Sequence, residues 1–430
     1  MRGRIGFVVL FVLVLTMTFS ITTIKPTYFA EAQRIPNQYI VVLKNNAADP
    51  ETVAKDMALA HGLGLGSIYG HALKGFSAVI PDSVLEKVRN DPRVSFVEQD
   101  QLVETFVLQP FHHQPGHEGG KSRPAPTQPS ETTPTGINRI DAERSIARTV
   151  DVDIAIIDTG IDLKHPDLNV LRGVTCSGAG APGGNDDNGH GTHVAGTAAA
   201  KDNDIGVVGV ASSAKLWAVK VLDKSGSGTI SCVIAGIDYV TANAAEIEVA
   251  NMSLGCACST EAGDIAINNS VAAGVTYAVA AGNSAKNVSG FWPASNPNVI
   301  TVSAIADSDG RCGGLGDATN YGVDDTFATF SNFGVGVDLA APGVNILSTY
   351  KGQTYKILSG TSMASPHVAG AAGLYKASNS GASPAQIQDA LTTLGILQTK
   401  ACDTTLNNGN GGFTLDPDAF PEPLVYTASL

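Results

Sequence analysis

Short apolar runs alternate with helical patterns after Gly136, and this alternation restricts the fold more than any other feature of the chain. Five runs are nearly continuous in apolar residues, as strands buried on both faces are: 152–157, 216–222, 249–254, 275–280 and 299–305. Three segments between them have the pattern of helices: 190–200, 229–243 and 263–273. Strands that alternate with helices predict an α/β fold, in which helices cover both faces of a mostly parallel sheet.

A smaller unit precedes this region at residues 33–106. Its strands and helices are predicted at 39–43, 50–61, 75–80, 81–90 and 94–98. That order is typical of a ferredoxin-like α+β domain. Residues 107–135 are rich in Pro, Gln, His, Gly and Thr, which predicts a flexible linker before a large domain at 136–400. The polar residues 401–430 are rich in Gly and Pro, so we expect a loosely attached C-terminal extension.

The first 32 residues have the features of a secretory signal peptide. Arg2 and Arg4 precede an apolar run at 5–15, and Ala30-Glu-Ala32 offers a small-residue cleavage site. The alternative is a membrane anchor, but the run is shorter than the roughly 18 residues that a membrane span requires. We therefore expect removal of 1–32 and an extracellular protein that has no membrane contact after this cleavage.

Composition excludes some classes of function. The net charge of −13 argues against binding to nucleic acid, and 43% hydrophobic residues permit a large core. The six cysteines all lie in the large domain or beyond it: Cys176, Cys232, Cys256, Cys258, Cys312 and Cys402. Export permits disulfides, but about 15 complete pairings are possible and the sequence selects none of them. The apolar surroundings of Cys232 also suit a buried free thiol.

Two segments at predicted strand and helix ends carry groups that suit catalysis. Asp158 directly follows the first strand of the large domain, so its carboxylate is either catalytic or caps the next turn. His190 and His193 lie three residues apart among small residues. Zinc-binding metalloprotease motifs space their histidines four apart around a Glu, which leaves a core histidine or a general base as alternatives. The small neighbours favour a functional site.

A third segment, from Gly360 to His367, passes from a strand-like run into a helix. Ser362 at this point is either a helix cap or a nucleophile, because the free N–H groups of a helix start also stabilise an oxyanion. Asn283 follows another strand and could direct its amide to the same point. Asp158, His190 and Ser362 therefore occur in the order of a catalytic triad, in which a carboxylate orients the base that activates a hydroxyl.

Ile157-Asp-Thr-Gly160, His190-Gly-Thr-His-Val-Ala-Gly196 and Gly360-Thr-Ser-Met-Ala-Ser-Pro-His367 together resemble motifs of the subtilisin-like serine proteases. The resemblance covers about residues 136–380 and is nearer the proteinase K side at 292–297. It implies the three-layer subtilisin-like fold, with Asp158 orienting the base, His190 as base and Ser362 as nucleophile. The Asn283 amide and the Ser362 N–H would form the oxyanion hole. The resemblance also implies structural roles for three other histidines: His165, His193 and His367.

The resemblance assigns peptide-binding segments as well. Ser253, Leu254 and Gly255 would pair with one side of an extended peptide, and Gly226, Ser227 and Gly228 with the other. Gly282 would belong to the wall of the pocket for the residue before the cut. Ile230, Val233 and Leu254 would line an apolar subsite, or they are plain core. Because pairing through the backbone accepts any sequence, we expect broad specificity.

Structural calcium is a further implication of the resemblance. Asp167, Asn203 and the carbonyl groups of Lys201, Ile205 and Val207 match one family loop, whose oxygen ligands suit a hard cation. Asp338 with the carbonyl groups of Pro297 and Val299 resembles a second site. Solvated acids on a turn are the alternative for both. Residues 307–325 form an insertion that short family members lack. The sequence indicates no role for its acidic residues, Asp307, Asp309, Asp317, Asp324 and Asp325.

Residues 33–106 resemble the I9-type inhibitory propeptide of this family, an intramolecular inhibitor and folding helper. The resemblance implies a monomeric, secreted serine endopeptidase that hydrolyses protein and peptide substrates and is made as an autoprocessed zymogen. We predict self-cleavage after Phe106. His112, His113 and His117 of the linker could bind metal or are simply solvated. Two other functions stay open at this point: a binding protein with decayed catalytic parts, and acyl transfer to an acceptor other than water.

Overall fold

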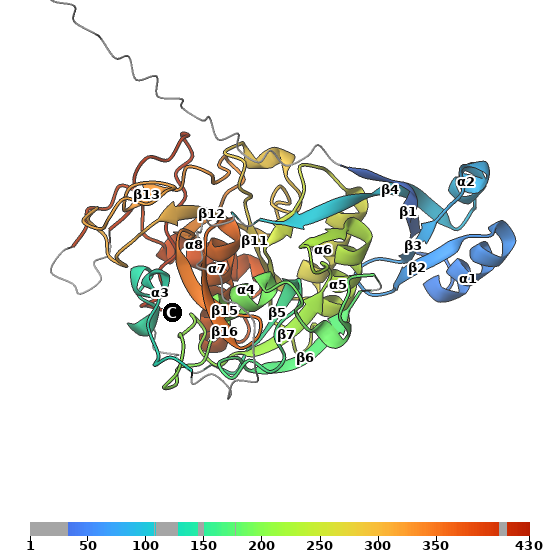
Figure 1. Cartoon of the computed structure of the whole chain (residues 1–430). Helices are drawn as coiled ribbons and strands as arrows, with labels where there is room; N and C mark the ends of the chain where they lie inside the picture. The colour runs from blue at the N-terminus through green and yellow to red at the C-terminus, as the bar shows by residue number, and fades with distance from the viewer. Residues whose placement is uncertain (1–32, 107, 109–127, 145–149, 177, 404–410) are drawn as a thin grey trace, which may run out of the picture.

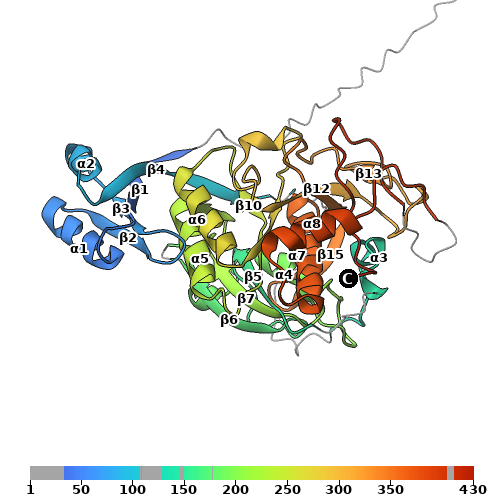
Figure 2. The ribbon, with the colours of Figure 1, turned by 180° about the vertical axis from the view of Figure 1, so that it is seen from behind.

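The fold is described from a computed structural model covering residues 33–106, 108, 128–144, 150–176, 178–403 and 411–430. Two units are visible in Figure 1: a small one (blue) and a larger layered one (green to red). The long strand β4 (Val94–Thr105) extends from the small unit across the face of the large one, and the view from behind in Figure 2 shows it reaching β10 (Leu254–Gly255).

The small unit is the predicted ferredoxin-like domain. Its remaining elements, in chain order, are β1 (Arg34–Leu43), α1 (Pro50–His61), β2 (Gly64–Tyr69), β3 (Gly75–Val79) and α2 (Asp82–Arg89). The strands pair antiparallel in the order β4-β1-β3-β2. Asp49 caps α1 through the Thr52 N–H, and Pro50 occupies the first turn, where its missing N–H costs nothing. The sequence did not predict β2, because its Gly-Leu-Gly-Ser start carries no strand pattern.

The large unit is built on a mostly parallel sheet in the order β13-β12-β11-β9-β5-β7-β6, with β14 also on β12. Only the β12–β13 pair is antiparallel among the described strands of this sheet. The strands are β5 (Asp153–Asp158), β6 (Val170–Thr175), β7 (Lys215–Lys220), β9 (Val249–Met252), β11 (Thr276–Ala280), β12 (Ile300–Ala306), β13 (Thr326–Phe327) and β14 (Leu339–Pro342). The five predicted strands are therefore confirmed.

Helices cover both faces of this sheet, as predicted. They are α3 (Thr135–Arg139), α4 (His190–Ala199), α5 (Ile230–Ala242), α6 (Glu261–Ala272), α7 (Thr361–Ser378) and α8 (Pro384–Leu394). Alternate residues of β5 show the layering: Ile154 and Ile156 pack in the cluster that includes α4 and α7, whereas Ala155 and Ile157 pack in the cluster that includes α5 and α6. A hairpin of β15 (Ile346–Tyr350) and β16 (Thr354–Leu358) leads into α7.

The two units share one sheet. Strand β4 lies between β10 and β8 (Ser227–Thr229) of the large unit and pairs antiparallel with both. The end of the small domain therefore enters the large domain as an added strand, the arrangement in which a peptide binds through its backbone.

The expectation of a loosely attached C-terminal extension is wrong for the described residues 411–430. Phe413, Leu424 and Val425 are almost fully buried. Leu424 forms bridges with both Ala340 and Ile396, and the Thr427 N–H donates to the Ile140 carbonyl. Apolar residues scattered among Gly and Pro give no periodic pattern, so their partners are set only by the tertiary fold.

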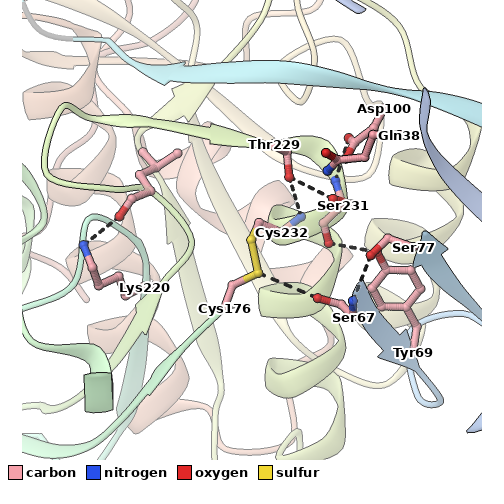
Figure 3. Close-up of a disulfide and its surroundings, with 11 residues drawn as sticks. Gln38, Ser67, Tyr69, Ser77, Asp100, Cys176, Lys220, Thr229, Ser231 and Cys232 are labelled. Atoms are coloured by element: carbon pink, nitrogen blue, oxygen red, sulfur yellow. Dashed lines mark hydrogen bonds between the residues drawn. A yellow bond between two sulfur atoms is a disulfide. The ribbon is translucent and has the colours of Figure 1, made fainter. Parts of the chain in front are cut away.

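The proposed free thiol at Cys232 is also wrong, because Cys232 forms a disulfide with Cys176. Cys256 pairs with Cys258, and Cys312 pairs with Cys402. Cys176 follows β6 and Cys232 lies in the first turn of α5, so the fold brings together residues 56 apart in the sequence. Figure 3 shows this bridge beside Ser67 of the small domain, whose hydroxyl lies 3.7 Å from the sulfur of Cys176.

Candidate active site

The predicted catalytic residues lie at the ends of neighbouring elements. Asp158 is the last residue of β5, His190 is the first of α4 and Ser362 is the second of α7. The Nδ1 atom of His190 lies 2.7 Å from an oxygen of Asp158, and both side chains are buried. The other Asp158 oxygen and the Nε2 atom of His190 have no hydrogen-bond partner among the described residues. This geometry fixes the tautomer in which Nδ1 carries the proton and Nε2 is free to accept one.

Ser362 is buried, and its hydroxyl donates to the Ser253 carbonyl at 3.1 Å rather than to His190. The fold therefore brings all three residues to one end of the sheet, while the serine hydroxyl has a backbone partner.

Asn283 contacts the end of the small domain. Its Nδ2 group donates to the Phe106 carbonyl oxygen at 2.7 Å. Its Oδ1 atom accepts hydrogen bonds from the backbone N–H and the hydroxyl of Thr361, at 2.9 and 2.8 Å. An amide held in this way directs a donor at one carbonyl oxygen, as an oxyanion hole requires.

The predicted peptide-binding segments flank the chain that ends at Phe106. Gly228 pairs with Val103, and Ser227 pairs with Glu104. On the other side, Leu254 pairs with Thr105, and Gly255 pairs with Glu104. In addition, the Thr105 N–H donates to the Gly226 carbonyl at 3.0 Å, and the Phe106 N–H donates to the Ser253 carbonyl at 3.5 Å.

Two side chains of this strand fill apolar sites. Phe106 is fully buried, and a Cβ built on Gly255 would lie 2.6 Å from its ring, so only glycine leaves room for the ring there. Val103 is also fully buried, in one cluster with the predicted subsite residues Ile230, Val233 and Leu254. These three residues are therefore core residues of the same buried cluster as Val103. Gly282, predicted in the pocket wall, has a φ of 103° and donates its N–H to the Thr361 hydroxyl.

Contacts continue beyond Phe106. The Leu108 N–H donates to the Ser359 carbonyl at 3.0 Å, and its side chain packs against the core. Val107, the predicted signal peptide and His112, His113 and His117 lie outside the described residues.

Carboxylates hold the small domain on α5 and α6, a feature that the sequence analysis missed. The Asp100 carboxylate accepts from the Ser231 N–H at 3.0 Å in the first turn of α5, as Figure 3 shows. Glu98 accepts from the Ala262 N–H at 2.9 Å in the first turn of α6. Burial raises the pKa of both carboxyl groups. The sequence offered one indication of these contacts, because Thr229 and Thr260 are typical helix N-caps and mark the starts of α5 and α6.

The large domain supplies a matching carboxylate to the small one. Asp238 of α5 accepts hydrogen bonds from the N–H groups of Gly70, His71 and Ala72, which link β2 and β3. Interactions of this kind are charge-assisted and stronger than neutral hydrogen bonds.

The other predicted histidines have backbone partners. The Nε2 atom of His193 lies 3.0 Å from the carbonyl oxygens of Ile346 and Lys356, and burial lowers its pKa to about 3. His367 approaches the Met363 carbonyl through Nδ1, and burial lowers its pKa to about 4. His165 approaches the Thr354 carbonyl.

The residues of the first predicted calcium site lie together around one loop. Asn203 donates to Asp167 at 2.9 Å through its side chain, and Val207 donates to Asp167 at 3.0 Å through its backbone. The loop also contacts Glu131, whose carboxylate accepts from the Asn203 N–H at 2.5 Å. The Lys201 ammonium donates to the Pro166 carbonyl. The Asn203 Oδ1 atom accepts from the Ile205 N–H at 2.8 Å. The loop thus gathers carboxylate, amide and carbonyl oxygens, the hard donors that suit calcium, although hydrogen bonds join them in this structure.

The residues of the second predicted calcium site contact Gln388 of α8. The Gln388 amide nitrogen lies 2.8 Å from an Asp338 oxygen and 3.5 Å from the Val299 carbonyl, so a hydrogen-bond donor joins two of the predicted ligands. The other Asp338 oxygen accepts from the Thr301 N–H. Burial raises the pKa of Asp338 to about 6. Hydrogen-bond donors therefore reach both carboxylate oxygens of Asp338, as they do at Asp167 of the first predicted site.

The insertion contains a further acidic cluster that could bind a metal ion. Oxygens of Asp307, Asp309 and Asp324 all lie within 4.8 Å of one another. Asp307 also forms a buried ion pair with Arg139 at 3.0 Å, and Arg139 pairs with Asp325 at 2.9 Å. The insertion acids therefore attach this segment to α3.

Comparison with known proteins identifies relatives of both units. Residues 150–411 match the family described as "Subtilase family", and residues 38–106 match "Peptidase inhibitor I9". An alkaline protease of Shouchella clausii is 40% identical over 305 residues, which cover 70% of this chain and 68% of the relative. Subtilisin Savinase of Lederbergia lenta is 43% identical over 266 residues, which cover 61% of this chain and 91% of the relative.

The fold has a similar counterpart among solved structures. The crystal structure of a cold adapted subtilisin-like serine proteinase matches with a TM-score of 0.52 and 32% sequence identity. The match covers 68% of this chain and 97% of the other chain. Among the described residues, no helix combines the length and apolar character needed to cross a membrane.

Proposed function

From its membership of the subtilase family, as a subtilisin-like serine endopeptidase with an inhibitor I9 domain, we propose how this chain works. The proposal names the residues that perform the hydrolysis and the bond at which the precursor cuts itself. That bond joins Phe106 to Val107. The observation that carries the proposal is the hydrogen bond from Asn283 to the Phe106 carbonyl oxygen, made while residues 102–105 lie as a strand between β8 and β10.

In the proposed reaction, Ser362 rotates its hydroxyl away from the Ser253 carbonyl and attacks the carbonyl carbon of Phe106. His190 takes the hydroxyl proton on Nε2, and Asp158 stabilises the resulting imidazolium through Nδ1. Negative charge develops on the Phe106 carbonyl oxygen, where the Asn283 amide and the Ser362 N–H receive it. The C–N bond then breaks as His190 gives its proton to the leaving amine of Val107. In the second half of the reaction, water attacks the acyl-enzyme while His190 takes its proton. His190 then returns that proton to the Ser362 oxygen as the ester bond breaks.

We extend this proposal to other substrates and to the location of the enzyme. Backbone pairing with β8 and β10 favours broad specificity, and the buried Phe106 and Val103 favour apolar residues at the cut and three residues before it. Three disulfides support an oxidising, extracellular compartment. We propose that the processed enzyme acts as a monomer.

The test is replacement of Ser362 by Ala. The Ser362→Ala precursor should accumulate uncut and hydrolyse no peptide, because one nucleophile serves both reactions. Ser270→Ala is a matched control, since Ser270 is equally buried but its hydroxyl contacts only Tyr277 among the described side chains. Hydrolysis that persists in Ser362→Ala would refute the assignment of the nucleophile, and processing that persists without hydrolysis would show that another protease cuts the precursor.

We also propose that calcium stabilises the loop of the first predicted site, where Asp167, Glu131, Asn203 and the carbonyl groups of Lys201, Ile205 and Val207 would hold the ion. The contribution of the ion would be structural, because it would neutralise the Asp167 and Glu131 carboxylates beside one loop. A chelator should lower the thermal unfolding midpoint of the enzyme, and Asp167→Asn should remove that response. Asp338→Asn should retain it, because Asp338 lies outside this loop and contacts Gln388 and Thr301 instead. An equal response in all three proteins would contradict this location.

A further inference from the structure

The turn at residues 281–286 determines where the Asn283 amide points. It follows β11 directly, and Gly282 adopts a φ of 103° within it, so the chain leaves the strand abruptly. The Asn283 side chain projects from this turn to the Phe106 carbonyl oxygen. An oxyanion donor must lie about 2.7–3.1 Å from the developing charge, so a small shift of the turn would weaken catalysis.

Asn332 holds this turn on both sides of Asn283. Its backbone N–H donates to the Gly282 carbonyl at 2.9 Å, and its Nδ2 group donates to the Ala281 carbonyl at 2.8 Å. Its Oδ1 atom accepts from the N–H groups of Ser284 and Lys286, at 3.0 and 3.1 Å. Four hydrogen bonds from one residue therefore bracket the position of Asn283.

The environment of Asn332 makes this arrangement rigid. The residue is fully buried, in a loop that follows β13, far from the turn in the sequence. A Cβ built on Gly282 would lie 2.5 Å from Nδ2 of Asn332, so the two backbones approach as closely as a glycine permits. Thr361 fixes the Asn283 side chain itself, whereas Asn332 bonds to the backbone on either side of Asn283.

We propose that Asn332 is a positioning residue for transition-state stabilisation: it holds the turn at 281–286 so that the Asn283 amide meets the carbonyl oxygen of the residue before the cut. The inference rests on the proposed function, in which Asn283 is the oxyanion donor. Asn332 acts through Asn283, so its effect should disappear when the Asn283 amide is absent.

The experiment is a double-mutant cycle with Asn332→Ala and Asn283→Ala, measured as kcat and KM on a peptide substrate. Asn283→Ala should lower kcat by about 10²–10³-fold, the loss known for this donor in subtilisin, which is the reference case. Asn332→Ala should lower kcat by about 10–100-fold with little change in KM, the scale expected for a misplaced catalytic group. When Asn283 is already Ala, the added Asn332→Ala substitution should change kcat by less than about twofold, because the effects of two coupled residues are not additive.

Two further variants keep the test decisive. Asn332→Asp preserves the acceptor for Ser284 and Lys286 and loses the donor to Ala281, so it should fold and show an intermediate loss of kcat. Asn296→Ala is the matched control, because Asn296 is buried and bonds to Asp264 and Asn298 away from the turn. It should leave kcat unchanged.

A full additional loss of kcat in the double variant, or an unchanged kcat in both Asn332 variants, would overturn the role of Asn332. An unchanged kcat in Asn283→Ala alone would refute the oxyanion assignment and this inference with it. Survival of hydrolysis in Ser362→Ala would refute the proposed function separately.

Discussion

At the scale of single residues, the end of the inhibitor domain lies as a bound substrate would lie. Phe106 is fully buried, its carbonyl oxygen accepts from the Asn283 amide, and the Leu108 N–H donates to the Ser359 carbonyl. Phe106 and Leu108 are therefore held at once, and a bound peptide held in this way needs little further ordering before reaction.

The first prediction concerns the side chain of Phe106. Phe106→Asp should slow self-cleavage by at least about 100-fold, because a carboxylate would have to be buried without a partner. Phe106→Leu should process within about tenfold of the natural precursor, since it also fills an apolar pocket. The rate of precursor loss, followed on gels, measures both. Equal rates for Asp and Leu would show that the cut lies elsewhere.

At the scale of elements, two helix starts and one sheet hold the inhibitor domain in place. The free N–H groups of α5 and α6 receive Asp100 and Glu98, where the helix dipole favours negative charge. In the opposite direction, Asp238 of α5 accepts a hydrogen bond from the His71 N–H in the turn between β2 and β3. Strand β4 adds backbone hydrogen bonds to β8 and β10, so the inhibitor binds through regular elements rather than through a single contact.

The second prediction tests this docking. Asp238→Ala should weaken the binding of the cleaved inhibitor domain by about 10–100-fold, because it removes charge-assisted hydrogen bonds worth roughly 1.5–3 kcal/mol. The change is measured by diluting the complex of processed enzyme and cleaved inhibitor domain and recording how strongly the enzyme is inhibited at each concentration. Asp151→Ala is a suitable control, since Asp151 is exposed and pairs only with Lys215 among the described residues. Equal inhibition in both variants would exclude a role for Asp238 in docking.

At the scale of the whole molecule, three segments far apart in the sequence form one unit at the end of the sheet away from the inhibitor domain (Figure 1). Arg139 of α3 pairs with Asp307 and Asp325 of the insertion and donates to the carbonyl groups of Gly411 and Gly412. The Cys312–Cys402 disulfide ties the insertion to the C-terminal extension. The extension is thus part of the folded domain.

The third prediction follows from Glu422, which is buried in this extension and bonded to the Ser303 hydroxyl. Burial, together with the nearby carboxylates of Asp416 and Asp418, raises its pKa from 4.5 to about 8. A raised pKa means that the folded state binds the proton more tightly than the unfolded state. The stability that this proton contributes is complete below about pH 4.5 and is lost as the pH rises through about 8.

Glu422→Gln should therefore unfold with less pH dependence between about pH 5 and pH 8 and should be more stable than the natural protein above about pH 8. Unfolding of the Ser362→Ala precursor across this range, with and without the second substitution, measures the difference. Glu246→Gln, at a side chain that is 49% exposed, should leave the pH dependence unchanged. Parallel pH profiles for the precursors with and without Glu422→Gln would contradict a protonated Glu422.

The sequence by itself determined the fold class and the catalytic candidates of this protein. The runs that became β5, β7, β9, β11 and β12 are apolar because both faces are buried, and such local patterns are visible without partners. Asp158, His190, Ser362 and Asn283 stood out because each follows or begins an element at the same end of the sheet.

Only the tertiary structure decided the contacts between distant segments. Two of the cysteine pairs (Cys176–Cys232 and Cys312–Cys402), the burial of residues 411–430 and the four hydrogen bonds of Asn332 join parts of the chain that have no common local pattern. Their specificity comes from three-dimensional proximity, because a hydrogen bond or a disulfide forms over a few ångströms and is indifferent to separation along the chain. The same reason explains why Ser362 could be identified from its motif, whereas its hydroxyl partner, the Ser253 carbonyl, could not.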